Sequence, residues 1–366
     1  MSSQREDRTP HAPAVAPTNS RYAIGVNGAI PKADLGITLP HEHLLVKGPR
    51  YMPGGEDDVC EPPALTDRWR LLKDPAGYRV NLDTGDVAET VQELSFFRAA
   101  GGSTVVDLSS HGLATKPQRL PEVAERSGLN IITATGLYIS DSHPEWAATA
   151  SVEELTERFV TDLTNPIDDE PRCGAIGEIG IELADEAEIR TIRASARAQA
   201  ETGAPCFWHV MSGILPSFRE QVHGLIDIYE QEGGDPNSLV LCHQDASGDD
   251  TNYQDAMLSR GVYFAIDNFG FESSFAFDGG YLQNPTDTER IHTLVDLLDR
   301  GWGDQLLISQ DICYRMMRRT WGGWGFAHIL EALPARFAAA GVDDATLAHL
   351  MVENPARLLA YAELDV

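Results

Sequence analysis

Residues 38–46 read TLPHEHLLV, a short apolar stretch that carries His41 and His43 with Glu42 between them. Successive side chains of a strand point to opposite faces, so the two histidines would share one face and Glu42 would point away from it. Two imidazoles on one face can hold a metal ion together. The alternative is that both are pocket or core histidines, and this stretch alone leaves that choice open.

Seven further β-branched runs follow along the chain, separated by longer helical patterns. Three helix starts show capping-box spacing or close to it, at residues 86–89, 151–154 and 286–289. Eight strands that alternate with helices predict an α/β fold, a (β/α)8 barrel of the TIM type. The eight predicted strands span residues 37–44, 103–109, 130–138, 173–181, 205–210, 239–245, 262–268 and 305–312.

Three connections are long, namely residues 44–85, 269–285 and 312–325. All three follow strands, so they would lie at the C-terminal face of a barrel, where active sites are built. The composition shows no break that would divide the chain, and we expect one barrel domain over residues 21–366. Residues 1–20 are rich in Pro, Ala and Ser without an apolar segment, which predicts a disordered tail and not a signal peptide.

The composition excludes some classes of partner. The 366 residues include 56 acids and 28 bases, a net charge of −28, which argues against nucleic acid and anionic membranes. No apolar run approaches the ~18 residues that a membrane helix needs. Five cysteines without a C-x-x-C pair fit reduced thiols and a cytoplasmic location.

Ionisable residues recur at the ends of the predicted strands. A buried charge without a partner is costly, and a metal ion supplies that partner. Four histidines and two acids on five strands suit two divalent ions, with one acid as the bridge between them. Imidazole and carboxylate ligands favour zinc, with manganese, iron or cobalt as alternatives. The predicted ligands are His41, His43 and Asp311 for one ion, His209 and His243 for the other, and Glu178 as the bridge.

The order and wording of these motifs resemble the phosphotriesterase family of the amidohydrolase superfamily, over roughly residues 22–360. The resemblance implies a (β/α)8 barrel with a binuclear metal centre that acts as a hydrolase. The stretches that carry it are LPHEHLL, GGSTVVDLS, IITATGLY, GAIGEIG, GGWGFAHIL and VENPARLL.

Three positions separate this chain from the best-known branches of that family. Phosphotriesterases and related lactonases have a carboxylated lysine as the bridge, whereas Glu178 stands here, as in the phosphotriesterase-homology and phosphotriesterase-related branches. Organophosphate-degrading members use a histidine after the aspartate of strand 7, and quorum-quenching lactonases an arginine; here Asn268 follows Asp267. The wording DNFGFE resembles the phosphotriesterase-related branch, members of which cleave N-acyl amides, while Tyr138 matches a lactonase-type pocket tyrosine.

The resemblance implies that a metal-bridging hydroxide attacks a carboxylic ester or lactone. Asp311 would take a proton and pass it to the leaving group, and Tyr138 would orient the carbonyl oxygen. An N-acyl amide is the next alternative, and a promiscuous organophosphate triesterase a weaker one. A non-catalytic metal-binding barrel is an alternative of another class, against which the complete ligand set argues. We expect a small-molecule substrate and a homodimer.

The long loops after strands 7 and 8 are rich in aromatic side chains, which can line an apolar pocket, pack the loops onto the rim or form a dimer interface. Arg315 could clamp an anionic group of the substrate, although pairing of the cluster Arg315, Arg318 and Arg319 with the many acids is the alternative. His111 and His143 could reach the mouth, and for Cys313 we expect an inert packing role. The predicted substrate-binding residues are Tyr138, Asp267, Asn268, Phe271, Arg315, Trp321 and Trp324.

Overall fold

The computed structural model describes residues 21–47, 64–73, 75, 78–114, 116–165, 170–213, 215–277 and 280–363. The tail predicted for residues 1–20 lies outside this part of the chain, as does Cys60. For Asp67 and residues 275–277 and 280–282 only the backbone is described, so the side chains of three aromatic residues in the loop after strand 7, Phe275, Phe277 and Tyr281, lie outside the described part of the chain.

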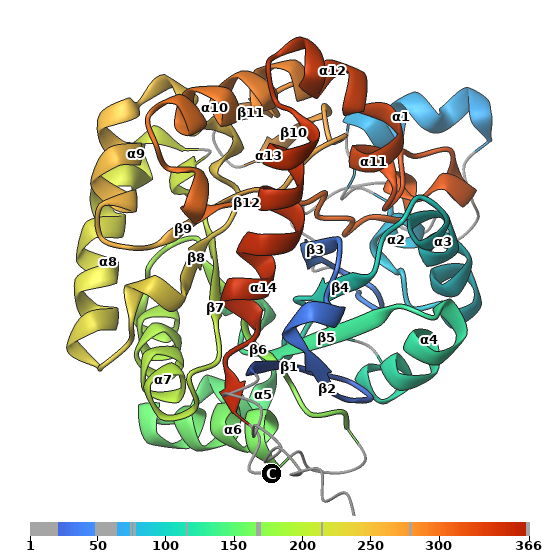
Figure 1. Ribbon diagram of the computed structural model, residues 1–366. Helices are drawn as coiled ribbons and strands as arrows, with labels where there is room; N and C mark the ends of the chain where they lie inside the picture. Colours follow the sequence, from blue (N-terminus) through green and yellow to red (C-terminus); the bar gives the residue numbers. More distant parts are fainter. Residues whose placement is uncertain are drawn as a thin grey trace, which may run out of the picture.

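Eight parallel strands form a nearly closed barrel, and all eight fall where the sequence predicted them (Figure 1). Each strand pairs with its neighbour in chain order, which is the topology of a (β/α)8 barrel. The strands are β3 (Thr38–Glu42), β4 (Thr104–Asp107), β5 (Asn130–Thr135), β6 (Ala175–Ile181), β7 (Cys206–Val210), β8 (Leu239–Leu241), β9 (Tyr263–Ile266) and β12 (Leu306–Ile308).

Alternation along the strands divides the core into two layers. Val106, Val240 and Leu307 belong to one buried cluster, in which residues of neighbouring strands meet inside the barrel. Their chain neighbours, such as Val105 and Leu241, belong to a second cluster that includes the apolar faces of the helices. The strands are therefore buried on both faces, which explains why they read as nearly continuous apolar runs.

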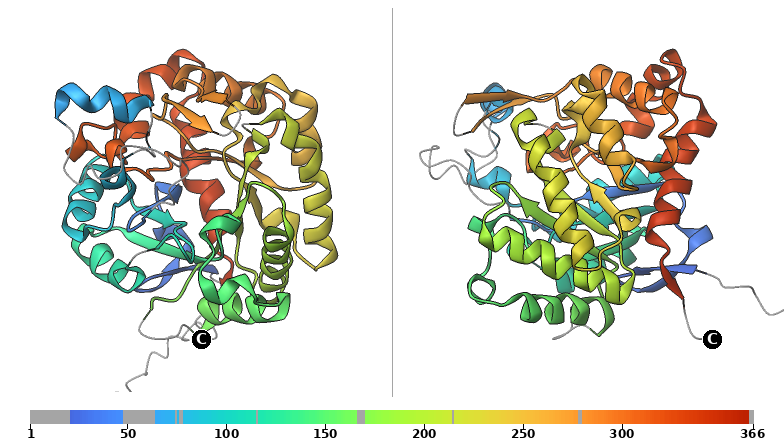
Figure 2. Two further views of the ribbon diagram at one scale, coloured as in Figure 1. Left: turned by 180° about the vertical axis from the view of Figure 1, so that it is seen from behind. Right: turned by 90° about the vertical axis from the view of Figure 1, so that its left-hand side faces the viewer.

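Helices surround the barrel on its outer side (Figures 1 and 2). The main ones are α3 (Val87–Ala99), α4 (Leu120–Ser127), α6 (Val152–Thr164), α7 (Glu186–Thr202), α8 (Arg219–Gln231), α9 (Thr251–Leu258), α10 (Asp287–Asp299) and α14 (Asn354–Leu359). The remaining described α-helices are α1 (Arg68–Lys73), α2 (Arg79–Leu82), α5 (Glu145–Ala148), α11 (His328–Ala332), α12 (Pro334–Ala339) and α13 (Asp344–Ala348).

The predicted helix starts are confirmed. Ser151 and Glu154 form a complete capping box at α6, and Thr286 forms one at α10 with the glutamate three residues later. At α3 the Asp86 carboxylate accepts a hydrogen bond from the Glu89 N–H at 2.8 Å. Each cap satisfies backbone N–H groups that have no partner within the helix.

A small antiparallel sheet, which the sequence did not predict, lies at the N-terminal end of the barrel (Figure 2). It consists of β1 (Arg21–Gly25), β2 (Gly28–Pro31) and β13 (Ala362–Glu363). The N–H of Val26 donates to the Ile131 carbonyl at the start of β5, 2.9 Å away. The sheet therefore covers the end of the barrel opposite to the predicted site.

The long connections lie at the C-terminal face. The connection after β9 contains an antiparallel hairpin of β10 (Ser274–Phe277) and β11 (Gly280–Gln283), and α1 lies beside β10 (Figure 2). Among the described helices, none is both long and apolar enough to span a membrane.

Candidate metal centre

The six predicted ligands converge at the C-terminal end of the barrel. His41, Glu178 and His209 lie within strands β3, β6 and β7, while His43, His243 and Asp311 follow β3, β8 and β12. All but His209 are buried, and the His209 side chain is 17% exposed. Two of them have a left-handed backbone, with φ of 59° at His243 and 45° at Asp311. Such conformations are costly outside glycine and occur disproportionately at functional sites.

The Glu178 carboxylate lies at the centre of the cluster. Its Oε1 is 3.1 Å from His209 Nδ1, 3.2 Å from His243 Nε2 and 3.3 Å from His41 Nε2. The second oxygen, Oε2, is 3.4 Å from His43 Nε2. One carboxylate therefore faces all four imidazoles, which is the position that a bridging ligand requires.

Asp311 completes one side of the cluster. Its Oδ1 lies 3.3 Å from His43 Nε2 and 3.8 Å from His41 Nε2. The ligand atoms of His41, His43 and Asp311 lie within 4.8 Å of one another, and so do those of His41, Glu178 and His243. The two groups share His41, so possible ligand atoms lie on both sides of this imidazole.

Two polar atoms in this cluster indicate what the site binds. Among the described residues, His41 Nε2 and Asp311 Oδ1 are buried and have no hydrogen-bond partner. Such groups are costly unless something else satisfies them. A divalent cation accepts electron pairs from both an imidazole nitrogen and a carboxylate oxygen, so the residues present fit a metal ion.

The charges of the cluster lead to the same conclusion. Burial lowers the pKa of His43, but Asp311 and Glu178 outweigh burial and raise it to about 9. Burial also lowers the pKa values of His41 and His243, and nearby acidic groups raise both well above the usual value. The carboxylates thus attract positive charge into the cluster, and a bound cation would compete with these protons.

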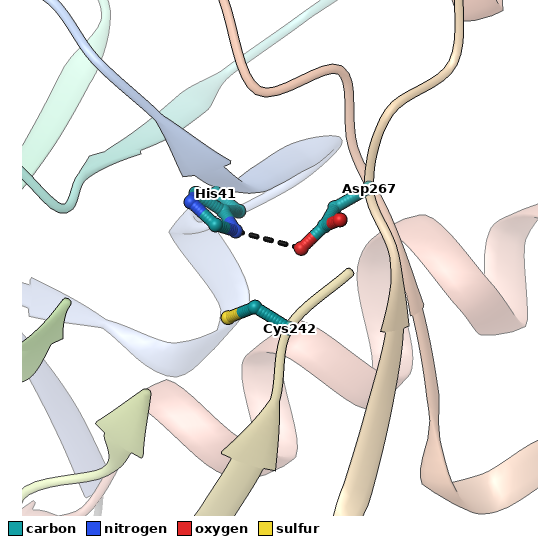
Figure 3. A group of neighbouring side chains, drawn as sticks. All are labelled: His41, Cys242 and Asp267. Carbon is teal, nitrogen blue, oxygen red and sulfur yellow. Dashed lines mark hydrogen bonds and ion pairs between the residues drawn. The ribbon is translucent and has the colours of Figure 1, made fainter. Parts of the chain in front are cut away.

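Asp267 is fully buried and lies behind two of the histidines. Its Oδ2 is 2.7 Å from His41 Nδ1, and its Oδ1 is 3.0 Å from His243 Nδ1. Figure 3 shows the pair of Asp267 and His41. Burial raises the pKa of Asp267, but His243 and His41 outweigh it and hold the pKa well below its usual range. These contacts indicate an orienting role for Asp267, in which both Nδ1 atoms are held so that the two Nε2 atoms face Glu178, and the predicted contact with substrate stays a prediction.

Cys242 lies close to this pair but does not add a metal site. Its sulfur, His41 and Asp267 have ligand atoms within 4.8 Å of one another (Figure 3). However, His41 Nδ1 is already bound to Asp267, and burial raises the pKa of the Cys242 thiol to about 12. The thiol therefore remains protonated and packs in the barrel interior.

His43 is oriented by two residues that sequence reasoning missed. Its Nδ1 lies 3.1 Å from Ser109 Oγ, and Ser109 donates in turn to Asp107 Oδ1 at 2.5 Å. Both residues belong to the stretch VVDLSS at the end of β4. A polar pair directly after a buried strand was the available signal.

Tyr138 lies against the fourth histidine. Its hydroxyl is 3.2 Å from His209 Nε2, and the two rings meet edge to face with centroids 4.7 Å apart. The same hydroxyl lies 3.4 Å from His209 Nδ1, the nitrogen that faces Glu178, so Tyr138 lies against both nitrogens of this imidazole. Tyr138 is thus placed both to orient His209 and to stand at the rim of the cluster.

The other predicted pocket residues are packed into the rim to different degrees. Asn268 is 8% exposed, and its amide lies 3.0 Å from Asp267 Oδ1 and 3.2 Å from His243 Nδ1. Phe271 is 3% exposed and stacks on Trp324 with ring centroids 5.9 Å apart. Trp321 and Trp324 are both partly exposed, so within this group they are the side chains that solvent reaches.

The structure pairs all three arginines with protein groups. Arg315 forms ion pairs with Glu89, at 2.5 Å for the nearest atoms, and lies over the Trp321 ring at 4.6 Å. Arg318 is fully buried and donates to the Leu44 carbonyl at 2.8 Å, and Arg319 pairs with Glu331. The Arg315 guanidinium, predicted to clamp substrate, is thus paired with Glu89. All three arginines of the cluster form ion pairs with acidic side chains.

The three remaining candidates lie outside the ring of ligands. His111 Nε2 is 2.8 Å from Asp162 Oδ2 on α6, and His143 Nε2 is 2.8 Å from the Tyr138 carbonyl oxygen. Burial and the negative charges of Asp311 and Glu178 raise the pKa of the Cys313 thiol well above its usual value. Cys313 is therefore protonated, which fits the packing role expected for it.

Known proteins resemble this chain over nearly its full length. The phosphotriesterase-related protein of Nematostella vectensis is 31% identical over 352 residues, covering 93% of this chain and 99% of that protein. The N-acetyltaurine hydrolase of Homo sapiens is 28% identical, covering 92% and 97%. The crystal structure of a resiniferatoxin-binding protein from Rhodobacter sphaeroides has a TM-score of 0.86 and 31% identity, covering 96% and 99%. Residues 24–359 match the phosphotriesterase family, and the chain belongs to that family of hydrolases.

Proposed function

We propose that the protein is a binuclear metal-dependent hydrolase of acyl compounds, with an N-acyl amide as the first candidate substrate and a carboxylic ester or lactone as the second. The observation that carries the proposal is the set of four imidazoles around Glu178, with His41 Nε2 and Asp311 Oδ1 lacking hydrogen-bond partners in the described part of the chain. The N-acetyltaurine hydrolases, similar over nearly their full length, favour the amide over the ester.

The residues that would hold the ions are His41, His43 and Asp311 on one side, His209 and His243 on the other, and Glu178 between them. Zinc is the ion that this donor set favours. When bound, such ions make water a strong nucleophile near neutral pH and polarise the bond under attack.

Four residues of the chain would then act on the reactants. Asp311 accepts the proton of the attacking water and passes it to the leaving group, because its Oδ1 is the acceptor in the cluster without a hydrogen bond. Tyr138 donates a hydrogen bond from its hydroxyl to the carbonyl oxygen, which it orients from its place beside His209. Trp321 and Trp324 provide partly exposed apolar surface for the acyl group.

The first test is the metal content. We expect about two divalent ions per purified chain, because ligands from five strands surround two sides of one carboxylate. Elemental analysis measures this directly, and His43→Asn should lose about one ion. His349→Asn is the matched control, since that histidine also pairs with two acids, Asp304 and Glu353, but belongs to a different part of the fold. At most one ion in the wild type after growth with added zinc or manganese would contradict the binuclear proposal.

The second test is the choice of substrate. We expect kcat/KM for the best N-acyl amide, ester or lactone to exceed that for paraoxon by at least ~100-fold, which is about 2.7 kcal/mol of transition-state stabilisation. The reason is that Asn268 cannot carry a proton where the organophosphate-degrading members have a histidine. Steady-state rates with N-acetyltaurine, a lactone series, aryl esters and paraoxon decide it, with chelator-treated protein as the blank. A triester whose kcat/KM equals or exceeds that of every acyl substrate would contradict this order of preference.

A further inference from the structure

The last seam of the barrel, between β12 and β3, is closed mainly by side chains, although the other seven are closed by a backbone ladder. In the described chain, ladder pairing runs from β12 through β9 to β3, and none is assigned between β12 and β3. Ser309 Oγ instead accepts from the His41 N–H at 3.2 Å and lies 2.9 Å from the His41 carbonyl oxygen. His41 and His43 stand on one side of this seam and Asp311 on the other.

Glu42 occupies this seam. The strand pattern turns it away from the two histidines, as expected from the sequence, but its carboxylate is fully buried. Oε1 accepts from the Gln310 N–H at 2.9 Å and lies 2.8 Å from Ser309 Oγ, and Oε2 accepts from the Ile312 N–H at 2.8 Å. The two oxygens therefore hold the amides on both sides of Asp311.

The backbone at Asp311 depends on such support. Its φ of 45° lies in the left-handed region, which costs free energy unless the surroundings impose it. The Asp311 N–H donates to the His41 carbonyl at 3.3 Å, so the N–H groups of residues 310, 311 and 312 all point towards β3. Successive N–H groups around a left-handed residue form a concave site for acceptor oxygens, and the two Glu42 oxygens fill it at residues 310 and 312.

Burial raises the pKa of Glu42 to about 7, while the N–H groups of Ile312 and Gln310 and the Ser309 hydroxyl oppose the rise. We propose that Glu42 is a positioning residue, whose carboxylate holds the segment 310–312 so that Asp311 faces the ligands His41 and His43. Glu42 itself touches neither reactants nor ions. The inference rests on the proposed function, because Asp311 matters only where that site binds cations.

Glu42→Gln tests the role with little change of size. A carboxamide places an NH2 group against one of the two N–H donors, so one side of the Asp311 segment loses its acceptor. We expect metal-free protein to bind Co²⁺ about 10–100-fold more weakly at the weaker site, the range typical of lost partners of metal ligands. We also expect kcat to fall while KM changes little, because the substrate pocket is untouched. Chelator competition, followed by the Co²⁺ absorption spectrum, measures the affinity without any substrate.

Glu93→Gln is the matched control. Glu93 is also a fully buried glutamate that accepts from two backbone N–H groups of the same connection, Arg319 at 2.9 Å and Thr320 at 2.7 Å. It holds the connection after β12 but does not flank Asp311. We expect comparable loss of thermal stability in both variants and loss of Co²⁺ affinity only in Glu42→Gln. An equal loss of Co²⁺ affinity in the two variants would overturn the positioning role in favour of general destabilisation.

If Glu42→Gln does not fold, Glu42→Asp serves in its place, because it keeps the charge and withdraws it by one methylene. We expect a smaller loss of Co²⁺ affinity there, about fivefold for one weakened hydrogen bond. Wild-type affinity and kcat in a folded Glu42→Gln or Glu42→Asp would overturn the inference. A wild-type chain that binds two cations but hydrolyses no acyl compound would overturn the proposed function alone, since the affinity comparison would still stand.

Discussion

Asp311→Asn should lower kcat by about 10²–10⁴-fold while the protein keeps most of its bound metal. The substitution preserves the size of the side chain and one oxygen that can ligate an ion, but it removes the group that accepts a proton, and lost acid–base catalysis has this magnitude. Burial raises the pKa of Asp311, yet His41 and His43 outweigh it and keep the pKa below its usual range, so the carboxylate is ionised at neutral pH. Steady-state kinetics combined with elemental analysis of the same sample measures both quantities.

The matched control for this variant is Asp162→Asn. Asp162 is likewise buried and pairs with an imidazole, that of His111 at 2.8 Å, but it contacts none of the six predicted ligands. Its loss should lower stability and leave kcat close to that of the wild type. Full turnover by Asp311→Asn with a complete set of ions would dismiss the proton role and leave Asp311 as a ligand alone.

The barrel could be predicted from the sequence because each signal for it lies within a short stretch of the chain. Each strand is a short apolar run, and each of the three predicted caps is a pair of residues three positions apart. The sheet of β1, β2 and β13 was not predictable in this way, because β1 pairs with a strand more than 300 residues later, Arg21 with Glu363. Nothing in either segment alone identifies its partner.

The same contrast between local and long-range evidence explains which residues of the site could be predicted. The ligand candidates could be chosen because a histidine or acid at the end of an apolar strand is unusual in itself. The orienting residues could not be chosen, because their roles depend on which strands lie side by side. Asp267 reads as a pocket residue until β9 is placed next to β8 and near β3, where it meets His41 and His243. Arg315 likewise reads as a clamp until α3 brings Glu89 to it.

A buried ion network lies next to Asp267 and Asn268 and supports this part of the site. Arg290 on α10 is fully buried; its Nε lies 2.7 Å from Asp245 Oδ1, and another guanidinium nitrogen lies 3.2 Å from Asp287 Oδ1. It also donates to the Phe271 carbonyl at 2.8 Å. Asp245 in turn accepts from the N–H groups of Asp267 and Asn268, at 3.3 and 3.1 Å. One guanidinium thus connects α10 to the residues that orient His41 and His243.

Arg290→Met should therefore lower the free energy of unfolding by about 3–5 kcal/mol, the usual cost of leaving buried charges without their partner. Methionine fills much of the volume, so the loss reports on the charge more than on a cavity. Denaturant unfolding of the metal-free protein measures it, and we expect the double variant Arg290→Met/Asp245→Asn to lose less than the sum of the single changes, because one stranded carboxylate is then neutral.

Arg260→Met is the control, since Arg260 also pairs with two acids, Asp227 and Glu230, whose side chains are 58% and 42% exposed. Water can solvate those carboxylates when the arginine is removed, so the expected loss is at most about 1 kcal/mol. Equal losses for Arg290→Met and Arg260→Met would show that Asp245 and Asp287 find other partners or protons when Arg290 is absent. The orientation of Asp267 would then have to come from its two histidines alone.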